Sequence, residues 1–217
     1  MKLKITGILL ALVGSSLGAT VTLSSVGINY DGSDDYGIVI NGNPVLQGNG
    51  TASVGYFTIS DSQVQNLASM SNQQSYDTLF SSFVSITSDN FTGINTSYGA
   101  NPGFFSTDIA GYNAAGLNNT LYAYFRSGGF YGLFKSNLTI VPDLGGTSPE
   151  FTYALNLKPG SGTALIGRYG TSYQVPYNGI GAAPTMVQSF DIGIPEPSTT
   201  ALGIIGTLGF FRRRRNR

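Results

Sequence analysis

Carboxylates are the residues of this chain that could perform acid–base chemistry, because the sequence contains neither cysteine nor histidine. Disulfide bonds, thiolate or imidazole metal sites, cysteine nucleophiles and histidine-dependent triads are therefore excluded. A glycan hydrolase or lyase working with carboxylates alone would need two of them facing each other across a cleft. The candidate acids are scattered and form no E-x-D or D-x-E cluster: Asp61, Asp77, Asp89, Asp108, Asp143 and Glu150. This pattern favours a protein that is not an enzyme.

One acidic segment has the spacing of a cation-binding loop. Asp31, Ser33 and Asp35 stand at alternate positions, where their oxygens can converge on Ca²⁺ as in D-x-[DN]-x-[DN] loops. The glycine that follows the third ligand in such loops is displaced to Gly37, and Gly42 stands where the terminal glutamate would fall. A solvated turn between two strands explains the segment equally well. We therefore expect no metal or other cofactor, with calcium bound by Asp31, Ser33 and Asp35 as the alternative.

The formal net charge of zero conceals basic ends on an acidic body. Between Thr20 and Ile194 the sequence has ten acidic residues and four basic ones, a net charge of −6. The four basic residues are Arg126, Lys135, Lys158 and Arg168. Nucleic-acid binding relies on lysines and arginines that neutralise phosphates. An acidic body therefore argues against nucleic acid as a partner.

Residues 1–19 have the features of a secretory signal peptide. Lys2 and Lys4 precede an apolar run over residues 5–13, and small residues follow it. Cleavage after Gly18 would place a serine at the −3 position, whereas cleavage after Ala19 would place a bulkier leucine there. The segment predicts export by the Sec translocase and removal by signal peptidase.

The C-terminal segment has three parts in a fixed order. Pro195, Glu196 and Pro197 are followed by an apolar run that ends at Phe211. The basic cluster comes next and consists of Arg212, Arg213, Arg214, Arg215 and Arg217. This pattern resembles a PEP-CTERM sorting signal, the tail cleaved by exosortase-type membrane proteases in Gram-negative bacteria that make extracellular polymer. The resemblance covers about the last 23 residues and implies an exosortase-like partner and cleavage near residues 195–197.

The physical properties of this tail agree with a sorting role. The two prolines fix φ and remove backbone donors, so the segment around them should be extended and accessible to a protease. Arginines beside an apolar run resist translocation and act as a membrane stop signal. A helix over residues 199–211 would be about 20 Å long at 1.5 Å per residue, shorter than the hydrocarbon core of about 30 Å. We expect a transient membrane handle, with a basic tail lying on anionic lipid as the alternative.

The body, residues 20–193, is expected to be one mainly β domain of sandwich or jelly-roll type. Short apolar runs alternate with glycine, asparagine, serine and proline, which is typical of strands joined by turns. The clearest element is an aromatic hairpin whose turn contains Gly128 and Gly129, since glycine tolerates the positive φ of tight turns. The expected strands are 21–28, 36–40, 53–59, 103–109, 120–125, 130–135, 138–141, 151–155, 163–169 and 186–192.

A helical insertion is expected over about residues 61–84, followed at the C-terminus by the short apolar helix of the tail. Its first part has Ser60 or Asp61 as the N-cap. In the second part an apolar stripe recurs at helical spacing and consists of Tyr76, Leu79, Phe80, Phe83 and Val84. Asp77 near its start suits the positive end of the helix dipole. We interpret the stripe as core.

Three functions are compatible with these observations. The leading hypothesis is a structural protein of the cell surface or extracellular matrix, anchored transiently in the inner membrane and then released by cleavage of the tail. The second is a carbohydrate-binding module or adhesin for extracellular polysaccharide, with or without calcium. The third is a carboxylate-dependent glycan-active enzyme, for which the scattered acids offer little support.

Overall fold

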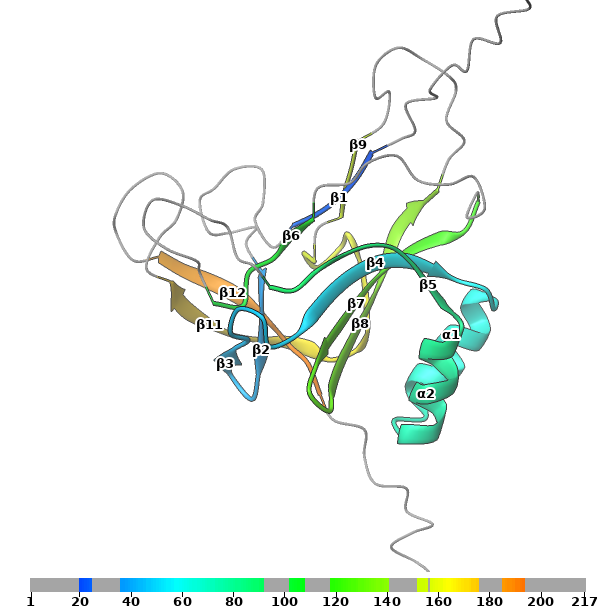
Figure 1. Ribbon diagram of the computed structural model, residues 1–217, viewed down its shortest axis with the longest axis horizontal. Helices are drawn as coiled ribbons and strands as arrows, with labels where there is room; N and C mark the ends of the chain where they lie inside the picture. Colours follow the sequence, from blue (N-terminus) through cyan, green and yellow to red (C-terminus); the bar gives the residue numbers. More distant parts are fainter. Residues whose placement is uncertain are drawn as a thin grey trace, which may run out of the picture.

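The computed structural model describes residues 20–24, 36–91, 102–107, 118–140, 152–155, 157–175 and 185–193. These residues form a mainly β body with two short helices, as Figure 1 shows. The expected signal peptide, the loop at 31–35 and the sorting tail at 194–217 lie outside the described residues. The proposals about those segments therefore remain predictions.

Twelve strands and two helices make up the described body. The strands are β1 (Thr20–Ser24), β2 (Tyr36–Ile40), β3 (Asn43–Pro44), β4 (Thr51–Phe57), β5 (Phe83–Asp89), β6 (Ser106–Thr107), β7 (Thr120–Ser127), β8 (Phe130–Thr139), β9 (Thr152–Leu155), β10 (Gly162–Ile166), β11 (Arg168–Val175) and β12 (Thr185–Asp191). The helices are α1 (Asp61–Ser69) and α2 (Gln73–Ser81). They are inserted between β4 and β5.

The strands form three sheets. The five-stranded sheet has the order β10-β8-β7-β4-β5, and all of its pairs are antiparallel. The four-stranded sheet has the order β11-β12-β2-β3 and contains a parallel pair, β12 with β2. A small third sheet, β6-β1-β9, also includes a parallel pair, β1 with β9. Two of the sheets are therefore mixed.

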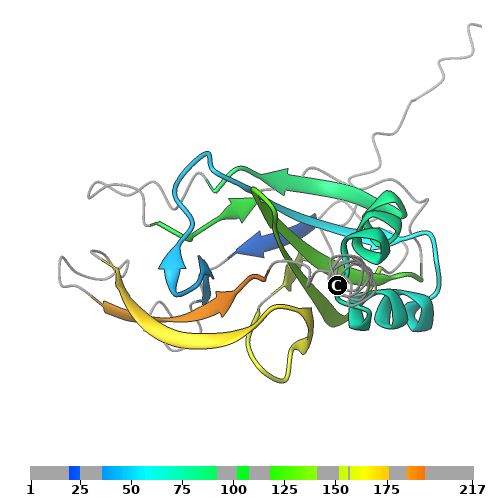
Figure 2. The ribbon, with the colours of Figure 1, turned by 90° about the horizontal axis from the view of Figure 1, so that it is seen from below.

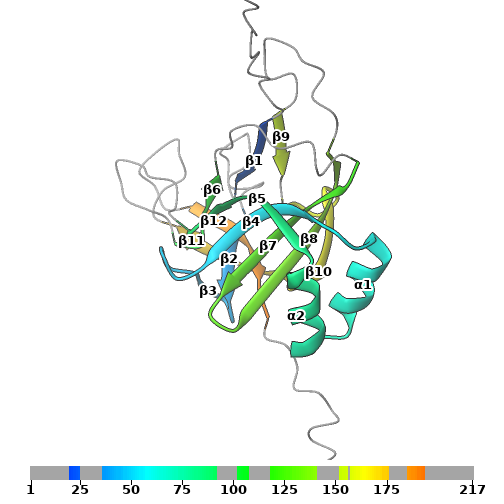
Figure 3. The same ribbon diagram turned by 45° about the vertical axis from the view of Figure 1, so that its right-hand side comes forward.

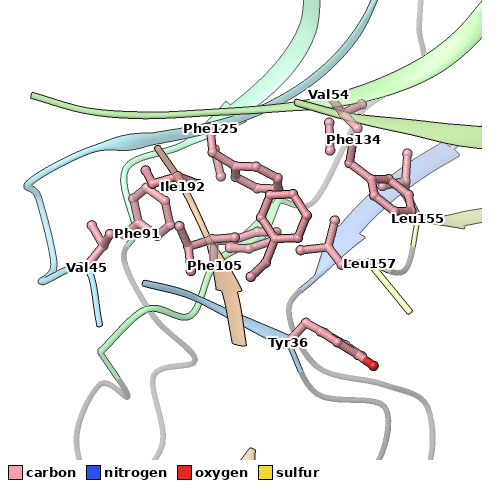
Figure 4. Packing of buried hydrophobic residues seen from close by; sticks show 14 of the residues in the cluster. Tyr36, Val45, Val54, Phe91, Phe105, Phe125, Phe134, Leu155, Leu157 and Ile192 are labelled. Carbon is pink, nitrogen blue, oxygen red and sulfur yellow. The ribbon is translucent and has the colours of Figure 1, made fainter. Parts of the chain in front are cut away.

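The largest core lies between the five-stranded and the four-stranded sheets. Leu121, Ala123 and Phe125 alternate along β7 and all point into this core. Ile38 of β2 and Phe190 of β12 come from the other sheet. Figure 4 shows how Phe125 and Phe134 meet Phe105 and Leu157, with Tyr36 at the margin. The two sheets thus share one apolar interior.

The opposite face of the five-stranded sheet is covered by the helices. Tyr122, Tyr131 and Leu133 project from β7 and β8 on this side and pack with Val64 of α1 and Leu79 of α2. Figure 3 shows both helices on one side of the sheet, next to β8 and β10. Both faces of the sheet are therefore covered at β7, which explains why this strand is almost continuously apolar.

Local capping fixes both helices. Ser60 caps α1, and a capping box forms because the Gln63 amide donates to Ser60 Oγ while the Ser60 amide donates to Gln63 Oε1. Asn72 caps α2 by accepting a hydrogen bond from the Ser75 amide at 2.9 Å. Ser60, one of the two expected caps, is confirmed. Asp77 does not lie in the first turn, because α2 begins earlier, at Gln73.

The helical insertion is confirmed, but its last helix ends at Ser81 and not near residue 84 as expected. The chain leaves α2 at Ser82, and Phe83 and Val84 belong to β5, which pairs with β4. Phe83 still packs with the helical cluster, but Val84 is 37% exposed. Phe83 continued the apolar spacing of the helix because the start of β5 packs it on the helix side of the sheet, whereas Val84 points to the other face. Pairing with β4 over Phe83–Asp89 decided the outcome.

Most expected strands are present with altered bounds. The aromatic hairpin is confirmed, with Ser127 opposite Phe130 and a two-residue turn in which Gly128 has φ +58°. Of the separately expected strand 138–141, Leu138 and Thr139 are the end of β8, and Ile140 lies beyond the strand. The strand expected at 163–169 divides at Gly167 into β10 and β11, because this residue has φ +98°. The strand expected at 103–109 is reduced to β6 within the described residues.

A close contact joins the two large sheets at one end. The Tyr131 amide donates to the Gly193 carbonyl at 2.8 Å, and the Gly193 amide donates back to Tyr131 at 3.0 Å. Gly132 makes this approach feasible, since a Cβ there would come within 2.4 Å of Ile192 Cγ2. The end of β12 is thereby fixed against the start of β8.

Candidate functional site

Asp61 is the centre of a polar cluster where α1 meets the five-stranded sheet. Its Oδ2 lies 2.6 Å from Lys135 Nζ and accepts a hydrogen bond from Thr120 Oγ1 at 2.9 Å. Its Oδ1 accepts from the Tyr122 hydroxyl at 2.8 Å. The register of the hairpin places Tyr122 opposite Lys135, so the two donors approach the carboxylate side by side. Three residues of the sheet therefore hold the first residue of α1.

The surroundings of Asp61 keep it ionised. Burial acts to raise its pKa, but the hydrogen bonds from Lys135, Tyr122 and Thr120 together outweigh burial, and the pKa lies below its usual value. The pKa of Tyr122 is raised by burial, by its hydrogen bond to Asp61 and by the negative charge of Asp61. At neutral pH the cluster is an ion pair with a neutral phenol.

A small polar pocket of about 200 Å³ opens beside this cluster. It is lined by Phe57, Ile59, Ser60, Asp61, Asn118, Asn119, Thr120 and Tyr122. Asn118 has φ +67°, a conformation that asparagine tolerates better than most residues. The pocket contains a single carboxylate, whose oxygens already accept from three side chains. Its arrangement supports a structural tie between α1 and the sheet.

The raised pKa values predict a loss of stability at alkaline pH. Tyr122 and Tyr124 both have raised pKa values, chiefly through burial, whereas tyrosines in the unfolded chain ionise near pH 10, about their ordinary value. Their contribution is therefore fully present below about pH 10 and is lost as the pH rises through the folded-state values. Each contributes a slope of at most about 1.4 kcal/mol per pH unit.

Chemical denaturation at a series of pH values tests this expectation. We expect the free energy of unfolding to fall less steeply above about pH 10 in a variant carrying Tyr122→Phe and Tyr124→Phe. Tyr56→Phe is the matched control, because it also removes one phenol from the same sheet, at a side chain that is only half-buried. Equal slopes in the wild type and the double variant would contradict the assignment.

A second, larger hollow lies on the four-stranded sheet. Its volume is about 720 Å³. Val39, Asn41, Gly42, Arg168, Tyr169, Gly170, Thr171, Ser189 and Asp191 line it. We call it the outer-face groove, because Asp191 and Ser189 alternate along β12 with the core residue Phe190 and point away from the main core. Figure 2 shows β11 and β12 well away from the two helices.

Asp191 organises this groove. Its Oδ1 accepts a hydrogen bond from the Asn41 amide at 2.9 Å, and its Oδ2 lies 3.6 Å from a guanidinium nitrogen of Arg168. The Asp191 side chain is only 13% exposed, whereas that of Arg168 is 82% exposed. The carboxylate is thus fixed by the β2–β3 turn, and the guanidinium stands in solvent.

The residues singled out from the sequence do not form one site. Asp61 joins the polar cluster, while Asp77 accepts a hydrogen bond from Gln73 on its own helix at 2.7 Å. Asp89 ends β5. The other acids, Asp108, Asp143 and Glu150, and the loop residues Asp31, Ser33 and Asp35 are outside the described ranges.

No residue of the outer-face groove was selected from the sequence as a site residue. One local sequence pattern, the Asn-Gly pair at 41 and 42, does indicate part of it. Asn41 and Gly42 form a two-residue turn between Ile40 and Asn43, with φ values of 51° and 77°. An Asn-Gly pair between apolar strands is typical of such a turn. The pairing of that turn with Asp191 could not be read from the sequence, because 150 residues separate Asn41 from Asp191.

The described residues contain neither a cluster of metal ligands nor a helix that could span a membrane. Within the ranges described above, no three acidic side chains come together in a way that would hold a metal ion. Among the helices in those same ranges, none has the length and apolar character needed to cross a membrane.

The chain was also compared with known proteins. No protein-family model, no curated protein and no solved structure matches it.

Proposed function

We propose that this chain is an exported, non-catalytic protein of the cell surface or extracellular matrix. Its β body is delivered through the N-terminal signal and held transiently by the C-terminal tail. An exosortase-like protease then cleaves near Pro195, Glu196 and Pro197. The observation that carries the proposal is the three-part order of the tail, with the motif, the apolar run and the arginines in sequence.

The geometry of the body is consistent with a non-catalytic role. The layer order separates Asp61 from Asp191, because the first lies on the helix side of the five-stranded sheet and the second on the outer face of the four-stranded sheet. Each of these carboxylates is used by a structural contact. A glycosidase would need two carboxylates on opposite sides of one cleft.

Mass spectrometry of the mature protein from the producing bacterium tests the proposal. We expect an N-terminus at Ala19 or Thr20 and a C-terminus that lacks the arginine cluster. A variant with alanine at 195, 196 and 197 is expected to keep the arginines and to stay with the membrane. Ser198→Ala is the control and should be processed normally. A wild-type protein that still ends in the arginines would refute the processing step.

We propose a sandwich as the finer architecture of this body. The apolar interior shared by the five-stranded and four-stranded sheets supports it. The parallel pairs β12–β2 and β1–β9 would distinguish such a sandwich from a purely antiparallel jelly roll.

A second function, glycan binding as a carbohydrate-binding module or adhesin, is favoured by the outer-face groove. A hollow of about 720 Å³ lies within the range of roughly 300–1,000 Å³ that is usual for small-ligand sites. A glycan array with and without a calcium chelator tests this function. Loss of binding with the chelator would support calcium assistance, for which Asp31, Ser33 and Asp35 remain the proposed ligands.

A further inference from the structure

We propose that the outer-face groove binds a neutral, hydroxyl-rich polysaccharide, with a sugar hydroxyl bridging Asp191 and Arg168. The inference rests on the second function proposed above, glycan binding, and adds its location and ligand class. It stands on three features of the groove: its shape, its fixed carboxylate and its charge.

The shape follows from small residues on neighbouring strands. The register pairs Gly170 of β11 with Ser189 of β12, and Ser189 with Gly37 of β2. Gly170 and Ser189 therefore add little side-chain volume to the outer face, whereas the Tyr173 hydroxyl covers Gly37. A Cβ at Gly170 would lie 2.5 Å from Ser189 Oγ, so a side chain at this position would have to displace Ser189. The hollow of about 720 Å³ is lined by this Gly170–Ser189 pair.

The charged residues that could bind a ligand lie two residues further along the same strands, on the same face. Arg168 lies opposite Asp191, and Asp191 lies beside Val39 in the parallel pair. Asp191 Oδ1 is occupied by the Asn41 amide, so this oxygen fixes the carboxylate. The distance from Oδ2 to the guanidinium, 3.6 Å, is longer than a hydrogen bond. A hydroxyl between them can donate to Asp191 and accept from Arg168, and both bonds are charge-assisted.

The charge of the groove indicates a neutral ligand. Arg168 is balanced by Asp191 across the strand pair, so the groove has no net positive charge from this pair. The body from Thr20 to Ile194 carries a net charge of −6 and would repel an acidic polymer. The ring of Tyr169 packs edge-on against Phe190 and Tyr36. Hydrogen bonds, and not a stacking platform, are therefore expected to determine binding.

The test measures binding of the full chain to purified polysaccharides by calorimetry and affinity electrophoresis. Dextran, mannan and β-glucan represent neutral polymers, and alginate and polygalacturonate represent acidic ones. Asp191→Asn keeps an acceptor for the Asn41 amide, and Arg168→Gln keeps a donor, so both variants should fold. Arg126→Gln is the matched control, since it removes one exposed arginine from a different sheet.

We expect at least one neutral polymer to bind, with little change in affinity between about 0.05 and 0.5 M salt. Both groove variants should raise Kd about 10-fold or more, as the loss of a charge-assisted hydrogen bond predicts. The control should bind like the wild type.

The alternative outcomes separate the two levels of the proposal. If the wild type binds none of the polymers, glycan binding itself is refuted. If it binds but the groove variants bind equally well, the site is wrong and the function stands. Tighter binding to the acidic polymers, weakened by salt, would overturn the ligand class.

Discussion

Replacing Phe125 by alanine is expected to lower the free energy of unfolding by about 3–5 kcal/mol, the usual range for an aromatic residue deleted from a core. The Phe125 side chain is fully buried, and its ring lies 5.4 Å from that of Phe105 and 5.8 Å from that of Phe190, centroid to centroid. It therefore connects the five-stranded sheet with the four-stranded sheet. Alanine would leave a cavity at the position where both sheets meet.

Urea denaturation monitored by tyrosine fluorescence and circular dichroism measures this effect. Met186→Ala is the matched control, because Met186 is 55% exposed and its truncation should cost less than about 0.5 kcal/mol. A loss below about 1 kcal/mol for Phe125→Ala would mean that the two sheets do not share the interior described above.

Asp61→Ala is expected to produce the second largest effect, a loss of about 1–3 kcal/mol in the free energy of unfolding. The substitution removes the acceptor for three donors at once and leaves the buried hydroxyl of Tyr122 without its partner. Lys135 would also lose its counter-ion. Helix α1 would then be held to the sheet chiefly by apolar packing, while α2 would keep the hydrogen bond from Gln73 to the Tyr131 hydroxyl.

Asp61→Asn distinguishes the charge from the hydrogen bonds, because it keeps an acceptor and should cost less than alanine. Since the folded-state pKa of Asp61 is lowered, its stabilisation is present above the ordinary value near pH 4 and is lost as the pH falls further. The loss of unfolding free energy in Asp61→Asn relative to the wild type should therefore become smaller at acid pH.

Asp77→Ala is the control for Asp61→Ala. It breaks only a contact within α2 and should change the free energy of unfolding by less than about 0.5 kcal/mol. Equal losses for Asp61→Ala and Asp77→Ala would contradict the cluster.

The two regions of the body have different roles in this description. The Asp61 cluster holds α1 against the sheet, and its polar groups are occupied by one another. The outer-face groove has one fixed carboxylate and one exposed guanidinium, which leaves hydrogen-bonding capacity toward solvent. For this reason we place ligand binding at Asp191 and structural support at Asp61.

The sequence by itself determined the elements that depend on neighbouring residues. The hairpin of β7 and β8 followed from two aromatic runs around Gly128 and Gly129. Helix α1 followed from the cap at Ser60, and β2 was predicted with its observed bounds, Tyr36–Ile40. In each case the turn or cap chemistry and the apolar pattern act within a few residues, so they can be read along the chain.

Only the tertiary structure decided the boundary at Phe83, the order of the strands and the two polar sites. Helix and strand patterns both accommodate Phe83 and Val84, and pairing with β4 selected the strand. Asp61 meets Tyr122 across 61 residues, and Asp191 meets Asn41 across 150. Such contacts depend on sheet register, where a shift of one residue would turn every side chain to the opposite face. The sequence supplies the charged groups, and the register determines which of them meet.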